Sequence, residues 1–166
     1  MRMINLPTPS EQLNQLTLTG FVALFQPLTL VTVEEMNGRF SSEFIGPAWL
    51  RRSAPHLLKL GGLGNWWGKT FDGHGQGLNL VQRGDTIRAI IPVVLEERPS
   101  LLDTKPTLTI VYPTGSRFPW PWIVDELRRL DANTLLGLTM VTRFGLQRFA
   151  FPFLLHQVNS KTQSSN

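Results

Sequence analysis

The chain has 166 residues, a length that fits one domain, and it contains no cysteine. The lack of cysteine excludes disulfides, zinc sites built on thiolates, iron–sulfur clusters and a cysteine nucleophile. The formal charge of +4 comes from 16 basic and 12 acidic residues, which are spread evenly over the two halves of the chain. Because a nucleic-acid-binding domain concentrates its positive charge on one face or helix, we expect no nucleic-acid partner.

The first seven residues carry an early charge that no apolar stretch follows, so we expect no signal peptide. The longest apolar runs, such as residues 90–95, are far too short to span a bilayer. With the missing cysteines, these observations predict a soluble, cytoplasmic protein without a membrane span.

Helical spacing of apolar residues comes first along the chain. Residues 1–37 have this spacing, with Gly20 as a break. Thr32 and Glu35 have the spacing of a capping box, in which the hydroxyl and the carboxylate each accept a backbone N–H. A second helix is predicted at 47–59, since a proline stands at its start and two glycines follow its end.

Alternating apolar residues then predict a series of short strands separated by turns. These strands are predicted at 39–45, 66–71, 78–82, 86–94, 107–112, 135–142 and 147–157. Residues 122–130 fit either a strand or a helical turn. The pattern is typical of a mainly β, antiparallel sandwich or barrel with a helical N-terminal segment. We expect one domain at 1–158 and a disordered polar tail at 159–166.

Short motifs for nucleotides, metals and catalysis fail on their spacing or context. Gly64–Thr70 is one residue short of a phosphate-binding loop and holds two tryptophans, and Gly73–Gly77 lacks the βαβ unit of a dinucleotide site. The three histidines, His56, His74 and His156, have no metal-ligand spacing. The sequence therefore predicts no metal site, and it identifies neither a cofactor nor a catalytic residue.

The tryptophans are the more informative residues. Four of the five lie in two clusters, Trp66-Trp67 and Trp120-Pro121-Trp122. Adjacent residues of a strand point to opposite faces, so one of Trp66 and Trp67 should face the interior. These side chains either fill the core or line a ligand pocket with a few polar groups.

The densest charge cluster is Asp125–Asp131. In a strand, Asp125, Leu127 and Arg129 share one face, while Glu126 and Arg128 share the other. A carboxylate or guanidinium pointing into a barrel would orient a ligand. The alternative is a solvated face with cross-strand ion pairs.

Four segments together resemble a group of proteins: Gly38-Arg39-Phe40, residues 67–71, residues 125–131 and residues 135–137. They are similar to lipocalin-like bacterial domains that begin with a G-x-W-x-G motif. In such families the tryptophan closes the floor of the barrel and a late arginine packs on it. Here Phe40 replaces the tryptophan, and Arg148 is the counterpart of the arginine. The resemblance implies an antiparallel lipocalin-like barrel with an apolar ligand inside.

Our leading hypothesis is therefore a barrel that binds a small, mostly apolar molecule such as a lipid or pigment. The predicted ligand-binding residues are Trp66, Trp67, Phe71, Tyr112, Trp120 and Trp122, with Arg128 or Arg129 as a polar anchor. A second hypothesis is an enzyme on the same scaffold, with acid–base chemistry from Asp125, Glu126 or His74. A third is a partner-binding protein with an exposed patch at Phe118–Trp122. A homodimer stays open in each case.

Overall fold

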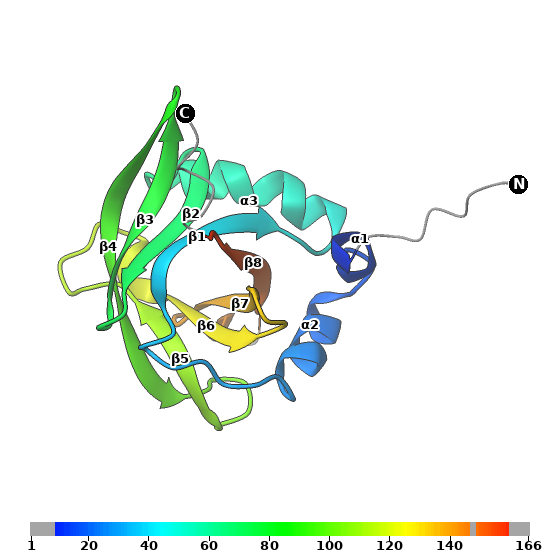
Figure 1. The fold of residues 1–166 in the computed structure, drawn as a ribbon. Helices are drawn as coiled ribbons and strands as arrows, with labels where there is room; N and C mark the ends of the chain where they lie inside the picture. Colours follow the sequence, from blue (N-terminus) through cyan, green and yellow to red (C-terminus); the bar gives the residue numbers. More distant parts are fainter. Residues whose placement is uncertain (1–8, 147–148, 160–166) are drawn as a thin grey trace, which may run out of the picture.

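The computed structural model describes residues 9–146 and 149–159. Eight antiparallel strands form a closed barrel, in which each strand pairs with the next along the chain and β8 returns to pair with β1 (Figure 1). The strands are β1 (Asn37–Phe44), β2 (Trp66–Asp72), β3 (Gln76–Arg83), β4 (Thr86–Pro99), β5 (Pro106–Val111), β6 (Ile123–Arg129), β7 (Thr134–Val141) and β8 (Phe151–Gln157). The predicted mainly β class and the antiparallel barrel are confirmed.

Three helices accompany the barrel: α1 (Pro9–Leu13), α2 (Leu18–Phe25) and α3 (Ala48–Leu60). The helix predicted at 47–59 is confirmed as α3. Residues 1–8 lie outside the described residues. In the rest of the predicted helical segment, the break falls at residues 14–17 rather than at Gly20, which lies inside α2. The helical prediction is wrong beyond Phe25, because residues 26–36 instead run across one end of the barrel, where Thr29 forms a β-bridge with Arg129. The capping-box prediction holds within a single turn: the Thr32 amide donates to Glu35 at 2.7 Å, and the Glu35 amide donates to the Thr32 hydroxyl at 3.4 Å.

The segment at 122–130, which fitted either a helix or a strand, contains both. A short 3-10 helix, η1 (Trp120–Trp122), ends where β6 begins. The strand conformation prevails from Ile123 because β6 has a hydrogen-bonded neighbour on each side, β5 and β7.

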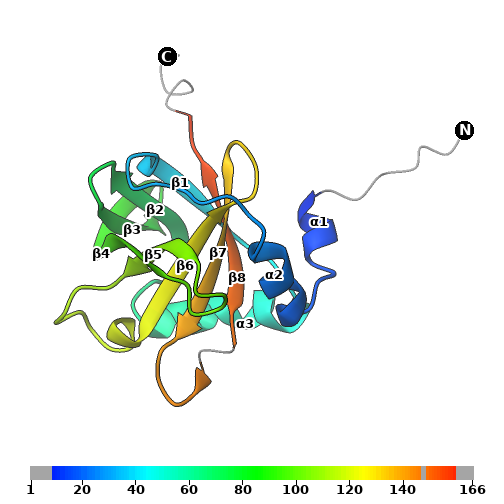
Figure 2. The ribbon, with the colours of Figure 1, turned by 90° about the horizontal axis from the view of Figure 1, so that it is seen from below.

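Two apolar cores lie on the two faces of the barrel wall. Inside, Phe40, Phe71 and Leu127 pack together and fill one end of the barrel. Outside, α2 covers β7 and β8 by burying Phe21 and Phe25 completely (Figure 2). The outer core explains why the N-terminal helices are needed, since the outer faces of β7 and β8 are themselves apolar.

A bulge in β2 decides which side chains point inward. The register with β3 shifts between Trp66 and Gly68, so that both Trp66 and Lys69 face the barrel interior although they are three residues apart. Gly68 has a φ of 154°, and a Cβ there would collide with the Phe40 carbonyl oxygen. The position therefore requires glycine.

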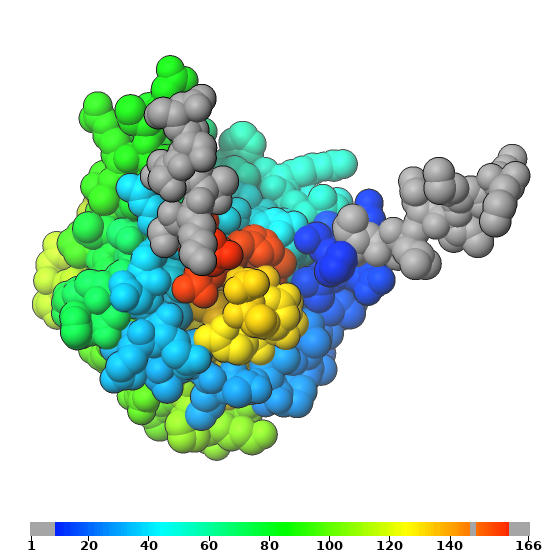
Figure 3. Space-filling model, in the orientation of Figure 1, coloured from blue at the N-terminus to red at the C-terminus, as the bar shows by residue number. Residues whose placement is uncertain are grey.

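The two ends of the barrel differ. We call one the mouth end; it carries α3 with its flanking residues (45–65), the β3–β4 turn, the β5–β6 loop (112–122) and the β7–β8 loop (142–150). The other is the closed end, which carries residues 26–36 and the three remaining turns. In Figure 3 the closed end faces the viewer, and the segment before β1 meets the β6–β7 turn over the barrel.

Candidate functional site

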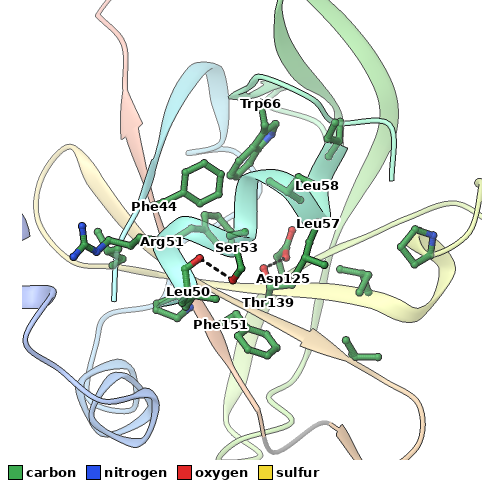
Figure 4. Close-up of a pocket in the computed structure, with 18 of the residues that line it drawn as sticks. Phe44, Leu50, Arg51, Ser53, Leu57, Leu58, Trp66, Asp125, Thr139 and Phe151 are labelled. Carbon is green, nitrogen blue, oxygen red and sulfur yellow. Dashed lines mark hydrogen bonds between the residues drawn. The ribbon is translucent and has the colours of Figure 1, made fainter. Parts of the chain in front are cut away.

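A cavity of about 500 Å³ lies between α3 and the mouth end of the barrel interior. This volume lies within the range of sites that bind small molecules, about 300–1,000 Å³. Figure 4 shows α3 crossing the cavity, with Leu57 and Leu58 on the helix and Asp125 and Thr139 on the barrel wall behind it. The walls are mostly apolar, and they include Leu50, Leu57, Leu58, Leu63, Trp66, Trp120, Ile123, Val141, Phe151 and Phe153.

Five polar side chains from five different strands or their ends meet on the wall of this cavity. We call Lys69, Asn79, Tyr112, Asp125 and Thr139 the polar cluster. Lys69 is its centre: Nζ donates to Asn79 Oδ1 at 2.8 Å and to the Tyr112 hydroxyl at 3.4 Å, and it lies 3.6 Å from Asp125 Oδ2. The Thr139 hydroxyl donates to the other Asp125 oxygen at 2.6 Å. An ion pair is thus held inside an otherwise apolar barrel.

The backbone fixes the direction of the Asn79 amide. Asn79 Nδ2 donates to the Ile91 carbonyl at 3.0 Å, so Oδ1 is left to accept from Lys69. Ile91 lies in a second bulge, on β4, with a φ of 49° that β-branched residues rarely adopt. A strained backbone position therefore supports the polar cluster.

Burial alters the acid–base properties of the cluster. Lys69 is 1 % exposed, and its removal from water lowers the pKa of the ammonium, while the Asp125 carboxylate opposes that change. Burial, with the negative charge of Asp125, raises the pKa of Tyr112 well above its usual value. Tyr112 is therefore a neutral hydroxyl at physiological pH, able to donate as well as accept.

An unpaired donor adjoins the cluster. The indole nitrogen of Trp66 is buried and has no hydrogen-bond partner among the described residues, and Trp66 itself lines the cavity. The Lys69 ammonium lies 5.4 Å from the centroid of the Trp66 ring and 5.6 Å from that of Tyr112. Because buried N–H groups are nearly always paired, a ligand with an acceptor atom would satisfy this one.

Trp120 joins the β5–β6 loop to the end of α3. Its indole nitrogen donates to the Gly61 carbonyl at 2.7 Å, and its ring stacks on Tyr112 at 4.9 Å between centroids. A Cβ on Gly61 would lie 2.7 Å from the Trp120 ring, so the close approach depends on this glycine. The contact fixes the C-terminal end of α3 over the cavity.

Three of the aromatic residues predicted from the sequence line the cavity: Trp66, Tyr112 and Trp120. The other three lie elsewhere. Trp67 is half-buried within the bulge, Phe71 packs on Phe40 in the inner core, and Trp122 contacts Phe118 and Phe144 outside the barrel. Only alternation and clustering guided the prediction, and neither distinguishes the cavity from the rest of the interior.

Neither arginine predicted as a polar anchor lies on the cavity wall. Arg128 is buried on the outer wall of the barrel, where it forms a bidentate pair with Asp103 and donates to the carbonyls of Phe25 and Gln26. Arg129 pairs with Glu35 at the closed end at 3.1 Å. The other arginine singled out from the resemblance, Arg148, lies outside the described residues.

The three residues considered for acid–base catalysis occupy different places. Asp125 is buried in the concave site. Glu126 is also buried, where burial raises the pKa of its carboxyl, but it faces outward and accepts from Ser100 and the Leu101 amide. His74 lies in an exposed turn at the closed end, where its amide donates to Asp72. Of the three, only Asp125 adjoins the cavity.

Sequence reasoning missed Lys69, Asn79 and Thr139. Lys69 follows the bulge, so strict alternation from Trp66 places it on the outer face. The available signal was a lysine directly after Trp66-Trp67-Gly68 and an asparagine between Leu78 and Leu80. Among the residues that the structure describes, no group of three or more histidine or acidic side chains could hold a metal ion. Within the same residues, no helix is long and apolar enough to cross a membrane.

Comparison with known proteins supports the fold alone. No protein-family model matches the chain, and no curated protein matches it. The solved structure of a protein from Thermomonospora curvata is similar, with a TM-score of 0.62 and 20% sequence identity. The match covers 82% of this chain and 84% of that one. The chain is thus an eight-stranded closed barrel that shares its architecture with the protein from Thermomonospora curvata.

Proposed function

We propose that the barrel binds one small, mostly apolar molecule such as a lipid or pigment, in the manner of lipocalin-like proteins. The observation that carries this proposal is the cavity of about 500 Å³ beneath α3, whose mostly apolar walls include the polar cluster on the barrel side. A ligand with an apolar body and one polar head group would place its body against the apolar walls and its head group at the polar cluster. Its head group would accept hydrogen bonds from Lys69, Tyr112 or the unpaired Trp66 indole.

The test measures occupancy of the cavity directly. Native mass spectrometry of freshly purified protein should reveal a co-purifying small molecule. After extraction of that molecule, a neutral naphthylamine dye should bind with saturation and alter the tryptophan fluorescence, since Trp66 and Trp120 line the cavity. Absence of both a bound molecule and a saturable dye signal would contradict the proposal.

Two substitutions on α3 provide a matched pair. Ala54 lines the cavity, whereas Ala48 is exposed at the start of the same helix. Ala54→Trp should fill the cavity and weaken dye binding by about tenfold or more, a change of roughly 1.4 kcal/mol. Ala48→Trp should leave binding unchanged. Equal effects of the two variants would place the dye outside the cavity.

An enzyme is the second candidate, because Asp125 and Lys69 lie together in the concave site. A carboxylate beside an amine whose pKa is lowered by burial is an arrangement that general acid–base catalysis uses. To test it, the co-purifying molecule is incubated with wild-type protein and with Asp125→Asn. A product that forms only with the wild-type protein supports an enzyme, and an unchanged molecule in both supports a binding protein.

A further inference from the structure

Large apolar side chains are exposed chiefly at the mouth end. Ten large hydrophobic residues are exposed in the described part of the chain, and seven of them lie on α3 or on the loops beside it. These seven are Trp49, Leu57, Leu60, Phe118, Phe144, Leu146 and Phe149. We call them the apolar rim. Leu60 is 76% exposed and Phe144 is 81% exposed, so most of the surface of each side chain is open to solvent.

Three members of the apolar rim also form part of the cavity wall. Trp49 and Leu57 are exposed and also line the cavity, as does Phe149. Phe118 and Phe144 both contact Trp122, with centroids 5.0 Å and 5.5 Å apart, so the β5–β6 and β7–β8 loops meet on this ring. Figure 2 shows α3 and these two loops on the same side of the molecule.

Charge is also divided between the two ends. The segments at 45–65, 112–122 and 142–150 contain no aspartate or glutamate. Their described residues supply five cations: Arg51, Arg52, Lys59, Arg117 and Arg143. None of the ion pairs found among the described residues involves these five. The remaining connection at this end, the β3–β4 turn, adds Asp85 with Arg83 and Arg88 near it.

The closed end has a different charge balance. Its connecting segments hold Glu34, Glu35, Asp103 and Asp131 with Lys105, and two of these carboxylates pair with arginines of β6, Glu35 with Arg129 and Asp103 with Arg128. Among the described residues, the connecting segments of the mouth end therefore carry an excess of cations without an ion-pair partner, although the charges are evenly distributed along the sequence.

We propose that the mouth end docks on the surface of an anionic lipid bilayer. Exposed tryptophan, phenylalanine and leucine beside arginine and lysine are the features of segments that lie in the membrane interface. Each cation near an anionic membrane contributes about 1 kcal/mol, whereas a carboxylate there would be repelled. The total absence of acidic residues from the three segments fits a negatively charged partner. Largely exposed side chains also suit a deformable lipid layer better than a flat protein face.

The surface adjoins the ligand site, and so this inference rests in part on the proposed function. A bilayer at the mouth end would meet Trp49 and Leu57, which form both the apolar rim and the cavity wall. An apolar molecule could then pass between bilayer and cavity without crossing water.

The experiment is co-sedimentation of the full chain with vesicles. Wild-type protein should sediment with vesicles of equal parts phosphatidylcholine and phosphatidylserine, and much less with phosphatidylcholine alone. Binding should weaken as salt is raised, because screening shortens the reach of surface charges. Protein that stays in solution with both vesicles at low salt, or that binds both equally, would overturn the proposal.

Variants of exposed residues separate the two contributions. Arg52→Gln with Lys59→Gln and Arg143→Gln should lower partitioning into the anionic vesicles by about two orders of magnitude. Leu60→Ser with Phe144→Ser should also lower partitioning strongly. The matched controls at the closed end are Leu30→Ser with Leu101→Ser, and Arg98→Gln with Lys105→Gln, which should bind as the wild type does. Equal losses in the controls would overturn the proposal.

Two further outcomes are informative. A dimer in sedimentation velocity that is lost in the Leu60→Ser, Phe144→Ser variant, together with no vesicle binding, would identify a second copy of the chain as the occupant and overturn the membrane proposal. Dye binding in solution without vesicles reports on the cavity alone. A protein that binds dye but not vesicles would retain the proposed function and lose only this inference.

Discussion

Two cations are buried in opposite faces of the barrel wall, and their surroundings differ. The Arg128 side chain is 1% exposed on the outer face, where it is shielded from solvent and donates to a carboxylate and two carbonyls. Its guanidinium carbon lies 4.5 Å from the centroid of the Phe25 ring. The Lys69 side chain is 2% exposed on the inner face, where its neighbours also line a cavity.

The difference indicates what each cation does. Arg128 joins three parts of the chain, namely the end of α2, the turn at 100–105 and β6, and it does not line the cavity. We therefore assign it a structural role. Lys69 pairs with Asp125 at 3.6 Å, a longer separation than the 2.8 Å of Arg128 and Asp103, and it faces space that a ligand could occupy. A charge that adjoins a cavity can exchange partners, whereas a charge enclosed by protein cannot.

The largest effect is expected for Arg128→Met. The change leaves Asp103 and two carbonyls without their donor, and breaking a buried pair costs about 3–5 kcal/mol. Urea unfolding should show this loss in the free energy of unfolding, while dye binding in the cavity should be retained. Arg98→Met, which breaks an exposed pair with Glu96, is the control. A loss below 1 kcal/mol would contradict the structural role.

Lys69→Met should cost less, about 2–3 kcal/mol, because Asp125 keeps its hydrogen bond from Thr139 and water can enter the cavity. Binding of a ligand with an accepting head group should weaken, while binding of a purely apolar dye should not. The double variant Lys69→Met, Asp125→Leu should be more stable than Lys69→Met alone, since it removes the unpaired charge. Equal weakening of both ligands would show that the head group lies elsewhere.

Asp103→Asn tests how the Arg128–Asp103 ion pair contributes to the pH dependence of stability. The Arg128 guanidinium holds the pKa of Asp103 below its usual value of 3.8. The unfolded chain then binds more protons in this range, so the stabilisation is present above about pH 4 and is lost as pH falls through the folded pKa. The variant should be about 1 kcal/mol less stable at pH 7 and should converge with the wild type in acid. A difference that persists at pH 2 would assign the effect to packing.

Arg129→Gln should have the smallest effect. Arg129 pairs with Glu35, whose side chain is 45% exposed, and pairs of this kind contribute about 0.2–1 kcal/mol. Thermal unfolding at low and high salt should show little difference from wild type. A loss comparable to that of Arg128→Met would mean that the closed end depends on this contact.

The sequence predicted the barrel well because the strands alternate and turns separate them. Even the segment at 122–130 was narrowed to two structures, both of which occur. The prediction failed where tertiary contacts override local pattern: residues 26–36 have helical spacing but lie across the barrel end. For the site, alternation and the clustering of tryptophans located Trp66, Tyr112 and Trp120 without separating them from the core residue Phe71.

The cluster around Lys69 could not be predicted because its members come from five strands and one depends on a bulge. Asp125 was considered for catalysis, but its partners are 56, 46, 13 and 14 positions away along the chain. Bulges shift register without a distinctive sequence signal other than a glycine. The difference in charge between the two ends could not be predicted either, because connecting segments at one end alternate along the chain with those at the other.

Because of the bulge at Trp67-Gly68, the face on which Lys69 lies depends on the number of residues in β2. Deleting Trp67, the extra residue of the bulge, would restore regular pairing and leave Lys69 opposite Asn79 on the same face as Trp66. Inserting one residue between Gly68 and Lys69, with regular pairing continued from Gly68, would instead turn Lys69 to the outside of the wall. Such an insertion would remove Lys69 from the polar cluster without altering any of the cluster's side chains. Families of barrels built on this plan can therefore gain or lose an internal charge by an insertion or deletion, a route that comparisons restricted to substitutions would overlook.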